Sequence, residues 1–213
     1  ILTADIVINE NLMSKITVAE DGTATINEGE TVREWTPIKY FINSDMVGYK
    51  GIFDGSNHTI SGLYGNSDDM HYMGFFALAN GATIKNLGII DSYFYEYRNV
   101  ASVVALARNT TIINCFSENC LIANESQRAG GIAGKLYDSN IIGCYNASTI
   151  RESGGGYYIG GIVGESVSTT ISDCFNTGSI VATGDKVGGI VGCINSSSAV
   201  VENCYNIGKI NSD

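Results

Sequence analysis

Residues whose types could support catalysis are few in this chain and are widely separated. His58 and His71 are its two histidines, and neither an H-E-x-x-H zinc-peptidase pattern nor a G-x-S-x-G serine-hydrolase pattern occurs. Asp68-Asp69 is the one adjacent aspartate pair, but neighbouring residues on a strand point to opposite faces, so a solvated loop is expected there. The sequence therefore predicts no catalytic residues, no metal site and no cofactor.

Six cysteines raise the question of disulfides or zinc, yet no C-x-x-C pair and no close histidine pair accompanies them. Four recur at intervals of 29, 30 and 30 residues, namely Cys115, Cys144, Cys174 and Cys204. Side chains stacked in register run parallel, which is poor geometry for a disulfide, and a free cysteine packs as a small apolar group. We expect these four thiols to be buried, stacked and reduced, and Cys120 to face inward as well. Cys193 occupies a slot held by Lys135 and Glu165 in the two preceding copies of the repeat, and no role is assigned to it.

A tyrosine-rich run from Asp91 to Arg98 is the most suggestive binding feature. If Ser92 and Phe94 face inward, strand alternation turns Tyr93, Tyr95 and Tyr97 outward. A row of exposed tyrosines suits recognition of a sugar or a protein, so these three residues are the candidate ligand-binding site. The alternative is that they pack beneath a neighbouring loop, at 123–128 or 151–158.

The positions of these side chains depend on a cassette of about 29 residues that repeats along the C-terminal two-thirds of the chain. It reads Gly-Gly-Ile-x-Gly, a polar stretch, and then Ile-x-x-Cys-aromatic-Asn. The clear copies run from Gly130 to Asn146, from Gly160 to Asn176 and from Gly188 to Asn206, and two degenerate copies precede them. Self-similarity at this period is typical of a solenoid.

A second column keeps the same spacing as the cysteines, and its members are Ile84, Ile112, Ile141, Ile171 and Val201. The apolar runs are short, rich in isoleucine and valine, and broken by glycine, asparagine and serine, which indicates strands. Stacking such strands about 4.8 Å apart would bury a continuous core. The sequence predicts an all-β, single-stranded parallel β-helix with 28–30 residues per coil, right-handed because parallel crossovers almost always are. The glycine pairs are interpreted as coil corners.

One β-helix domain is expected over 1–213. Residues 1–73 form irregular N-terminal coils with a hairpin insertion near 11–34, centred on Asp21-Gly22. Residues 74–213 form five cassettes, of which the last is incomplete. A cap-like segment is absent after Ile210, so Ile190, Val201 and Cys204 are expected to lie in an uncovered terminal coil. We expect the natural protein to continue into further repeats or domains.

The order of motifs resembles the GLUG-repeat proteins of bacteria. Leu2-Thr3-Ala4-Asp5-Ile6, Trp35-x-Pro37-Ile38 and Phe53-Asp54-Gly55-x-x-His58-Thr59-Ile60-Ser61-Gly62-Leu63 precede the cassettes, which end in patterns such as Asn203-Cys204-Tyr205-Asn206. GLUG repeats occur in immunoglobulin A peptidases and in filamentous-haemagglutinin-like adhesins. The resemblance implies a β-helix, a secreted or surface-attached setting and a role outside a catalytic site. The insertion near 11–34 and the first two cassettes, which lack the glycine pair, depart from the pattern.

Formal charge is −10 and the isoelectric point is near 4.5. A nucleic acid or an anionic membrane would need a basic footprint, so neither is expected as a partner. No apolar stretch reaches 18 residues, so no membrane insertion is expected. The expected location is extracellular or at the cell surface.

These features predict a non-catalytic β-helix module, an adhesin-like stalk or a binding surface for a host glycan or protein. Two alternatives stay open. A carbohydrate-active β-helix, a lyase or a hydrolase, would need paired carboxylates or a calcium cluster on one face. An accessory domain of a larger peptidase would have its catalytic domain outside this chain.

Overall fold

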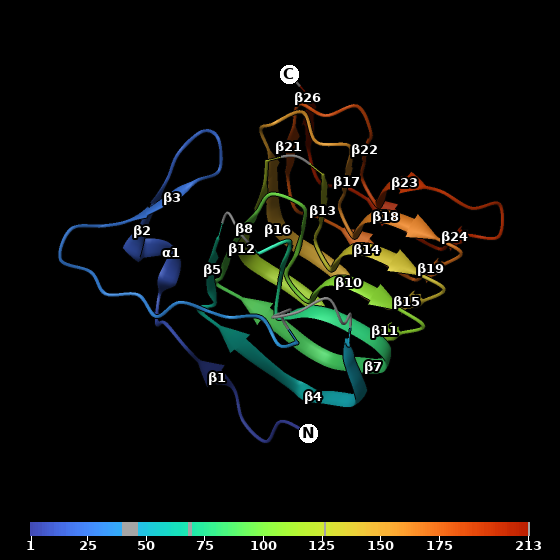
Figure 1. Cartoon of the computed structure of the whole chain (residues 1–213), viewed down its shortest axis with the longest axis horizontal. Helices are drawn as coiled ribbons and strands as arrows, with labels where there is room; N and C mark the ends of the chain where they lie inside the picture. Colours follow the sequence, from blue (N-terminus) through green and yellow to red (C-terminus); the bar gives the residue numbers. More distant parts are fainter. Residues whose placement is uncertain (40–46, 68–69, 126, 213) are drawn as a thin grey trace.

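Parallel strands stack into an all-β solenoid of about five turns with almost no helix (Figure 1). The computed structural model describes residues 1–39, 47–67, 70–125 and 127–212. β4 (Tyr49–Ser61) lies at one end of the solenoid and the C-terminal strand β26 (Ile210–Ser212) at the other. The predicted fold class, a parallel β-helix, is confirmed.

Each turn has four faces. The strands of three successive faces belong to one sheet, and the strands of the fourth face belong to a second sheet. The long strand β7 (Phe76–Ile90) runs through all three faces of the first sheet and pairs with a strand on each. The first face also holds β10 (Val104–Arg108), β14 (Ala133–Tyr137), β18 (Val163–Val167) and β23 (Val191–Ile194). The second holds β11 (Thr111–Ile113), β15 (Asn140–Ile142), β19 (Thr170–Ser172) and β24 (Val200–Glu202). The third holds β12 (Phe116–Asn124), β16 (Tyr145–Glu152), β20 (Phe175–Asn176), β21 (Ile180–Ala182), β25 (Tyr205–Asn206) and β26. β1 (Ile6–Val7), β5 (Tyr64–Asn66) and β8 (Tyr93–Glu96) extend the same sheet towards the N-terminus.

The second sheet has the strand order β22-β17-β13-β9-β6 and closes each turn. Its strands are short: β6 (Tyr72–Met73), β9 (Asn99–Ala101), β13 (Arg128–Gly130), β17 (Tyr158–Gly160) and β22 (Val187–Gly188). In the clear cassettes the glycine pair lies where this sheet turns into the first face.

Register in the ladders follows the cassette spacing. Ile112 pairs with Ile84 on one side and with Ile141 on the other, and Ile171 pairs with Val201. The inward asparagines also stack, because Asn146 Nδ2 donates to Asn176 Oδ1 at 2.7 Å and Asn176 repeats the bond to Asn206 at 2.7 Å. Equivalent residues of successive cassettes therefore occupy equivalent positions.

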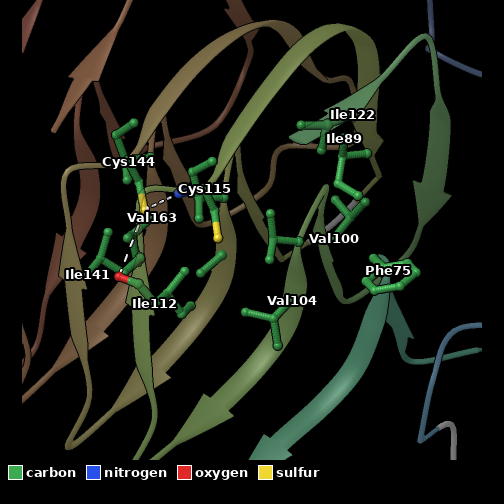
Figure 2. Close-up of a cluster of buried hydrophobic side chains, with 14 of the residues drawn as sticks. Phe75, Ile89, Val100, Val104, Ile112, Cys115, Ile122, Ile141, Cys144 and Val163 are labelled. Atoms are coloured by element: carbon green, nitrogen blue, oxygen red, sulfur yellow. Dashed lines mark hydrogen bonds between the residues drawn. The ribbon is translucent and has the colours of Figure 1, made fainter. Parts of the chain in front are cut away.

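The cysteine column lies in the core that the stacked coils enclose (Figure 2). Cys115, Cys144 and Cys174 are fully buried, and all six cysteines are free. The Cys115 amide donates to Cys144 Sγ at 3.3 Å, and the Cys174 amide donates to Cys204 Sγ at 3.4 Å. Cys204 differs from the expectation because it is only partly buried: its turn has a neighbouring turn on one side among the described residues.

Two features of the backbone form the corners between the faces: close contacts at glycines and residues with a positive φ. A Cβ on Gly131 would lie 2.3 Å from the Gly161 carbonyl oxygen, so close backbone approach, rather than a positive φ, requires glycine there. The position before each ladder cysteine is left-handed, with φ of 49° at Asn114, 64° at Gly143 and 56° at Asp173. Asparagine, aspartate and glycine tolerate that conformation best.

An antiparallel hairpin lies within the predicted 11–34 insertion, beside the solenoid (Figure 1). It comprises α1 (Leu12–Lys15), β2 (Ile16–Val18) and β3 (Ala24–Ile26). Its apolar side packs on the outer surface of the third face, where Leu12, Ile16 and Ala24 meet Tyr93 and Leu121 in a second apolar cluster. The hairpin therefore covers part of a surface that the repeat alone would leave in solvent.

Across the described residues, no helix is long and apolar enough to cross a membrane. In the last turn, Val201 and Ile210 are 39% and 40% exposed, and Ile190 and Cys204 are partly buried.

Candidate functional site

The expected row of exposed tyrosines does not exist. Tyr93 is 0% exposed and Tyr95 5%, and only Tyr97, at 45%, reaches solvent. The alternation was right, since Phe94 lies in the inner core. The expectation of exposure was wrong because the hairpin covers this surface. The alternative of packing against the 123–128 loop holds for Tyr95, which contacts Ala123 and Glu125.

The hydroxyl groups of the two buried tyrosines are engaged in hydrogen bonds. Tyr93 donates to the Gly22 carbonyl at 2.9 Å, and Tyr95 donates to Glu125 Oε2 at 3.0 Å. Burial raises the pKa of Tyr93 well above the usual tyrosine value. Tyr93 and Tyr95 thus anchor the hairpin surface and do not offer free ring faces to a ligand.

A cleft of about 390 Å³ opens between the hairpin and the third face, and we call it the hairpin cleft. Its lining residues are Met13, Val18, Asn119, Cys120, Leu121, Thr149 and Arg151. Ligand sites of small molecules typically have volumes of about 300–1,000 Å³ and combine apolar walls with a few polar groups. The hairpin cleft matches that description.

Arg151 forms the polar edge of the cleft and ties the hairpin to β16. Its Nη1 donates to the carbonyls of Ala19 at 3.0 Å and Glu20 at 3.4 Å, and Ser153 Oγ donates to the Asp21 carbonyl at 2.7 Å. Its Nε is buried and has no hydrogen-bond acceptor among the described residues. Buried donors are nearly always paired, so this unpaired donor at the edge of the cleft is a candidate partner for an acceptor of a ligand.

A ladder of stacked aromatic rings lies on the outer surface of the third face, along β12, β16, β20 and β25. Phe116, Tyr145, Phe175 and Tyr205 stack with centroid separations of 5.0, 4.9 and 5.2 Å. Tyr145 also donates to Glu118 Oε1 at 2.5 Å. Burial and then the Glu118 carboxylate raise the Tyr145 pKa, so its hydroxyl stays protonated. The rings cover one another's faces and stabilise the stack.

Apart from the hairpin cleft, a cluster of polar residues surrounds Glu165, whose side chain is 5% exposed. Its Oε2 accepts from Arg128 Nε and from Lys135 Nζ, the latter at 2.8 Å, and its Oε1 accepts from Asn195 Nδ2 at 2.6 Å. Burial by itself would raise the pKa of Glu165, but the hydrogen bonds from Lys135, Arg128 and Asn195 together bring it below the ordinary value. The carboxylate is ionised and fully engaged.

Sequence analysis did not identify this cluster. Lys135 and Glu165 occupy the same slot in consecutive cassettes, and opposite charges one coil apart are a usable signal for an ion pair. Arg128 comes from the other sheet, 37 residues before Glu165, and nothing in the repeat indicated that contact.

The histidines, which are candidate catalytic groups by residue type, have structural contacts. His58 Nδ1 lies 3.3 Å from Asp5 Oδ1, and Asp5 also accepts from the Thr59 amide at 2.7 Å, so this pair joins the N-terminal segment to β4. The His71 carbonyl accepts from Asn99. Asp68-Asp69 lies outside the described residues. Among the residues that are described, no group of three or more histidine, cysteine, aspartate or glutamate side chains is placed to hold a metal ion.

Known proteins match this chain in sequence over one cassette and in structure over its whole length. Residues 155–181 match the model of the GLUG motif. This segment is similar to the GLUG motif. A Bacteroides ovatus protein provisionally assigned as an immunoglobulin A1 protease, with a crystal structure at 1.30 Å resolution, superposes with a TM-score of 0.71. It is 23% identical, and the match covers 100% of this chain and 70% of that one.

The structural match shows a shared β-helix fold, and the motif match places a GLUG repeat within it. No curated protein is significantly similar to the chain in sequence. The GLUG resemblance derived from the cassettes is confirmed by the motif match, and the chain is a β-helix module that contains a segment similar to the GLUG motif.

Proposed function

We propose that this GLUG β-helix is a non-catalytic binding module of a secreted or surface-attached bacterial protein, and that it holds a glycan segment in the hairpin cleft. The cleft itself carries the proposal. Its volume suits one or two sugar rings, Met13 and Val18 supply apolar contact, and Thr149 and Arg151 supply hydrogen-bonding groups. The likeness to the Bacteroides ovatus protein supports a place beside a peptidase domain, as an accessory module.

The Glu165 cluster supports a non-catalytic role. A glycosidase needs one carboxyl group to donate a proton and a second to act on the opposite side of the sugar bond. Both oxygens of Glu165 already accept hydrogen bonds from cations or an amide, and its lowered pKa keeps the proton off. This carboxylate therefore stabilises the fold.

Filling the cleft tests the proposal. Thr149→Trp places an indole in the hairpin cleft, and Thr170→Trp is the matched control, because Thr170 has similar partial exposure on β19 of the second face. On a glycan array, the wild type and Thr170→Trp should retain the same glycans, and Thr149→Trp should lose them. Retention by Thr149→Trp of every glycan that the wild type binds would overturn the assignment of the cleft. Capture of protein ligands alone would replace the glycan with a protein segment.

A further inference from the structure

Two tyrosines on another part of the surface are each flanked by a pair of cations. Arg128 Cζ lies 5.5 Å and Lys186 Nζ 4.8 Å from the ring centroid of Tyr158. Arg108 Cζ lies 4.1 Å and Lys135 Nζ 4.5 Å from the ring centroid of Tyr137. We call this set, Arg108, Arg128, Lys135, Lys186, Tyr137 and Tyr158, the cation–tyrosine face.

The solenoid builds this face by stacking equivalent positions. Tyr158 on β17 is in register with Arg128 on β13, and Tyr137 on β14 is in register with Arg108 on β10. Arg128 lies in the column that contains Tyr158, on the second sheet. Its ion pair with Glu165 connects this column to the first face, where the column that contains Tyr137 lies. Cation–π contact and this ion pair hold long, flexible side chains in place, which lowers the entropy lost when a ligand binds.

The charge of the face differs from that of the molecule. Four of the twelve lysines and arginines gather here, in a chain whose net charge is −10. Glu165 and the exposed neighbours Asp138 and Asp185 oppose them, which leaves four positive charges against three negative ones. Among the described residues, neither Arg108 nor Lys186 has a carboxylate oxygen within 4.0 Å. Two cations are therefore free to pair with a ligand.

We propose that the cation–tyrosine face binds an acidic glycan, with carboxylate or sulfate groups paired to Arg108 and Lys186. The two cations lie three coils apart along the axis, or about 14 Å at the usual strand spacing. Tyr157, which is 56% exposed and has its ring centroid 6.1 Å from that of Tyr158, offers a ring for stacking on a sugar.

The spacing of the charges favours a glycan over a nucleic acid. Double-stranded DNA carries about one charge per 1.7 Å of axis, and it would meet the −10 molecule with strong repulsion around so small a basic area. An acidic glycan carries one charge per sugar or per disaccharide and leaves hydroxyl groups between them. That lower charge density matches sparse cations separated by tyrosines.

Charged and neutral forms of the same polymers provide the test. Affinity electrophoresis should show that polygalacturonate retards the protein more than its methyl-esterified form does, and that a sparsely substituted dextran sulfate retards it more than dextran does. Preference for polygalacturonate alone would identify carboxylate as the ligand group, and preference for dextran sulfate alone would identify sulfate. The double variant Arg108→Gln/Lys186→Gln should weaken binding about tenfold, as expected for two lost charge pairs. Lys50→Gln/Lys209→Gln, which removes two exposed charges elsewhere, should leave binding nearly unchanged.

Three results would overturn the proposal: equal retardation by charged and neutral polymers, equal weakening by both double variants, or tighter binding of duplex DNA than of either acidic polymer. Tyr157→Ala keeps all charges and should weaken binding severalfold, so it provides a second measure if the double variant folds poorly. Thr149→Trp should keep acidic-glycan binding, because the hairpin cleft is a different surface. Loss of that binding in Thr149→Trp would show that the face is not a separate site.

Discussion

At the residue scale, the thiol column shows how a reactive group becomes an inert packing group. Within the column, burial raises the pKa of Cys144 well above its usual value, whereas the hydrogen bond with Cys144 lowers the pKa of Cys174. Outside the column, burial raises the pKa of Cys120 to about 11. A thiolate is the reactive species, so Cys120 and Cys144 stay protonated at neutral pH, and Cys174 is kept from reagents by its full burial. The column therefore acts as a stack of small apolar groups between isoleucines.

The first prediction concerns these thiols. Titration of the native protein should detect Cys193 and Cys204, which are partly buried, and denaturation should release the four buried thiols. Cys174→Ala should lower the free energy of unfolding by about 1–2 kcal/mol through a small cavity, and Cys174→Asp should unfold the coil. Disulfides linking two or more of the ladder cysteines, found by mass mapping, would contradict this account.

The second prediction concerns Glu165 and pH. A carboxylate whose pKa is lowered by folding stabilises the folded state above its unfolded pKa, and that contribution is lost as the pH falls through the folded value. Glu165→Gln should therefore cost about 2 kcal/mol in urea unfolding at pH 7, and much less at pH 3. Glu202→Gln, at an exposed position on β24, is the control and should change little at either pH. An equal loss at both pH values would show that charge is not the reason.

At the element scale, the hairpin is an addition to the solenoid, whose turns could close without it. The second apolar cluster joins the hairpin to the outer surface, separately from the inner core. Its hydrogen bonds to the solenoid include Tyr93 to Gly22, Arg151 and Ser153 to the carbonyls of the turn, and the amides of Leu12 and Met13 to Asp91. An element held by one small cluster and a few hydrogen bonds is expected to open independently of the rest.

The third prediction follows from that arrangement. Leu12→Ala removes a fully buried side chain of the hairpin, and Leu63→Ala removes a fully buried side chain of the inner core; each deletion should cost about 2–4 kcal/mol. In hydrogen exchange, Leu12→Ala should raise the exchange of residues 16–26 and leave β11, β15 and β19 protected. Leu63→Ala should reduce protection throughout the solenoid. Uniform loss of protection in Leu12→Ala would mean that the hairpin and the coils unfold as one unit.

At the scale of the whole molecule, the solenoid presents long outer surfaces with two distinct characters. The hairpin cleft lies on the third face, and the cation–tyrosine face lies along β13, β17 and the first face. Both are assembled from several coils, so each depends on the stacking of successive turns. A rigid solenoid is suited to holding such surfaces in a fixed relation.

The fourth prediction concerns activity. The purified chain should hydrolyse neither immunoglobulin A nor polysaccharides, because the buried Glu165 carboxylate already accepts hydrogen bonds at both oxygens. Product formation should be measured over long incubations by mass spectrometry and by reducing-sugar assay. Turnover that a single carboxylate replacement abolishes would instead support the carbohydrate-active alternative.

Much of the fold followed from periodic positions in the sequence. The Ile84 column, the cysteine column and the asparagine stack recur at cassette spacing, and the ladders pair them in register. Stacking equivalent residues is the way a repeat buries its apolar positions, so local sequence was sufficient to predict these neighbours. Strand alternation likewise placed Phe94 inside and Tyr93 outside.

The tertiary structure alone decided which outward positions remain in solvent. Tyr93 and Tyr95 became buried because a hairpin about 70 residues away in sequence packs on them, as the bond from Tyr93 to Gly22 shows. Arg128 reached Glu165 because two sheets meet there, which no periodicity encodes. Repeats determine contacts between equivalent residues, and such contacts placed the cations of the cation–tyrosine face beside its tyrosines. Contacts between non-equivalent residues depend on how unique segments and corners fold back, and those contacts built the hairpin cleft and the Arg128–Glu165 ion pair.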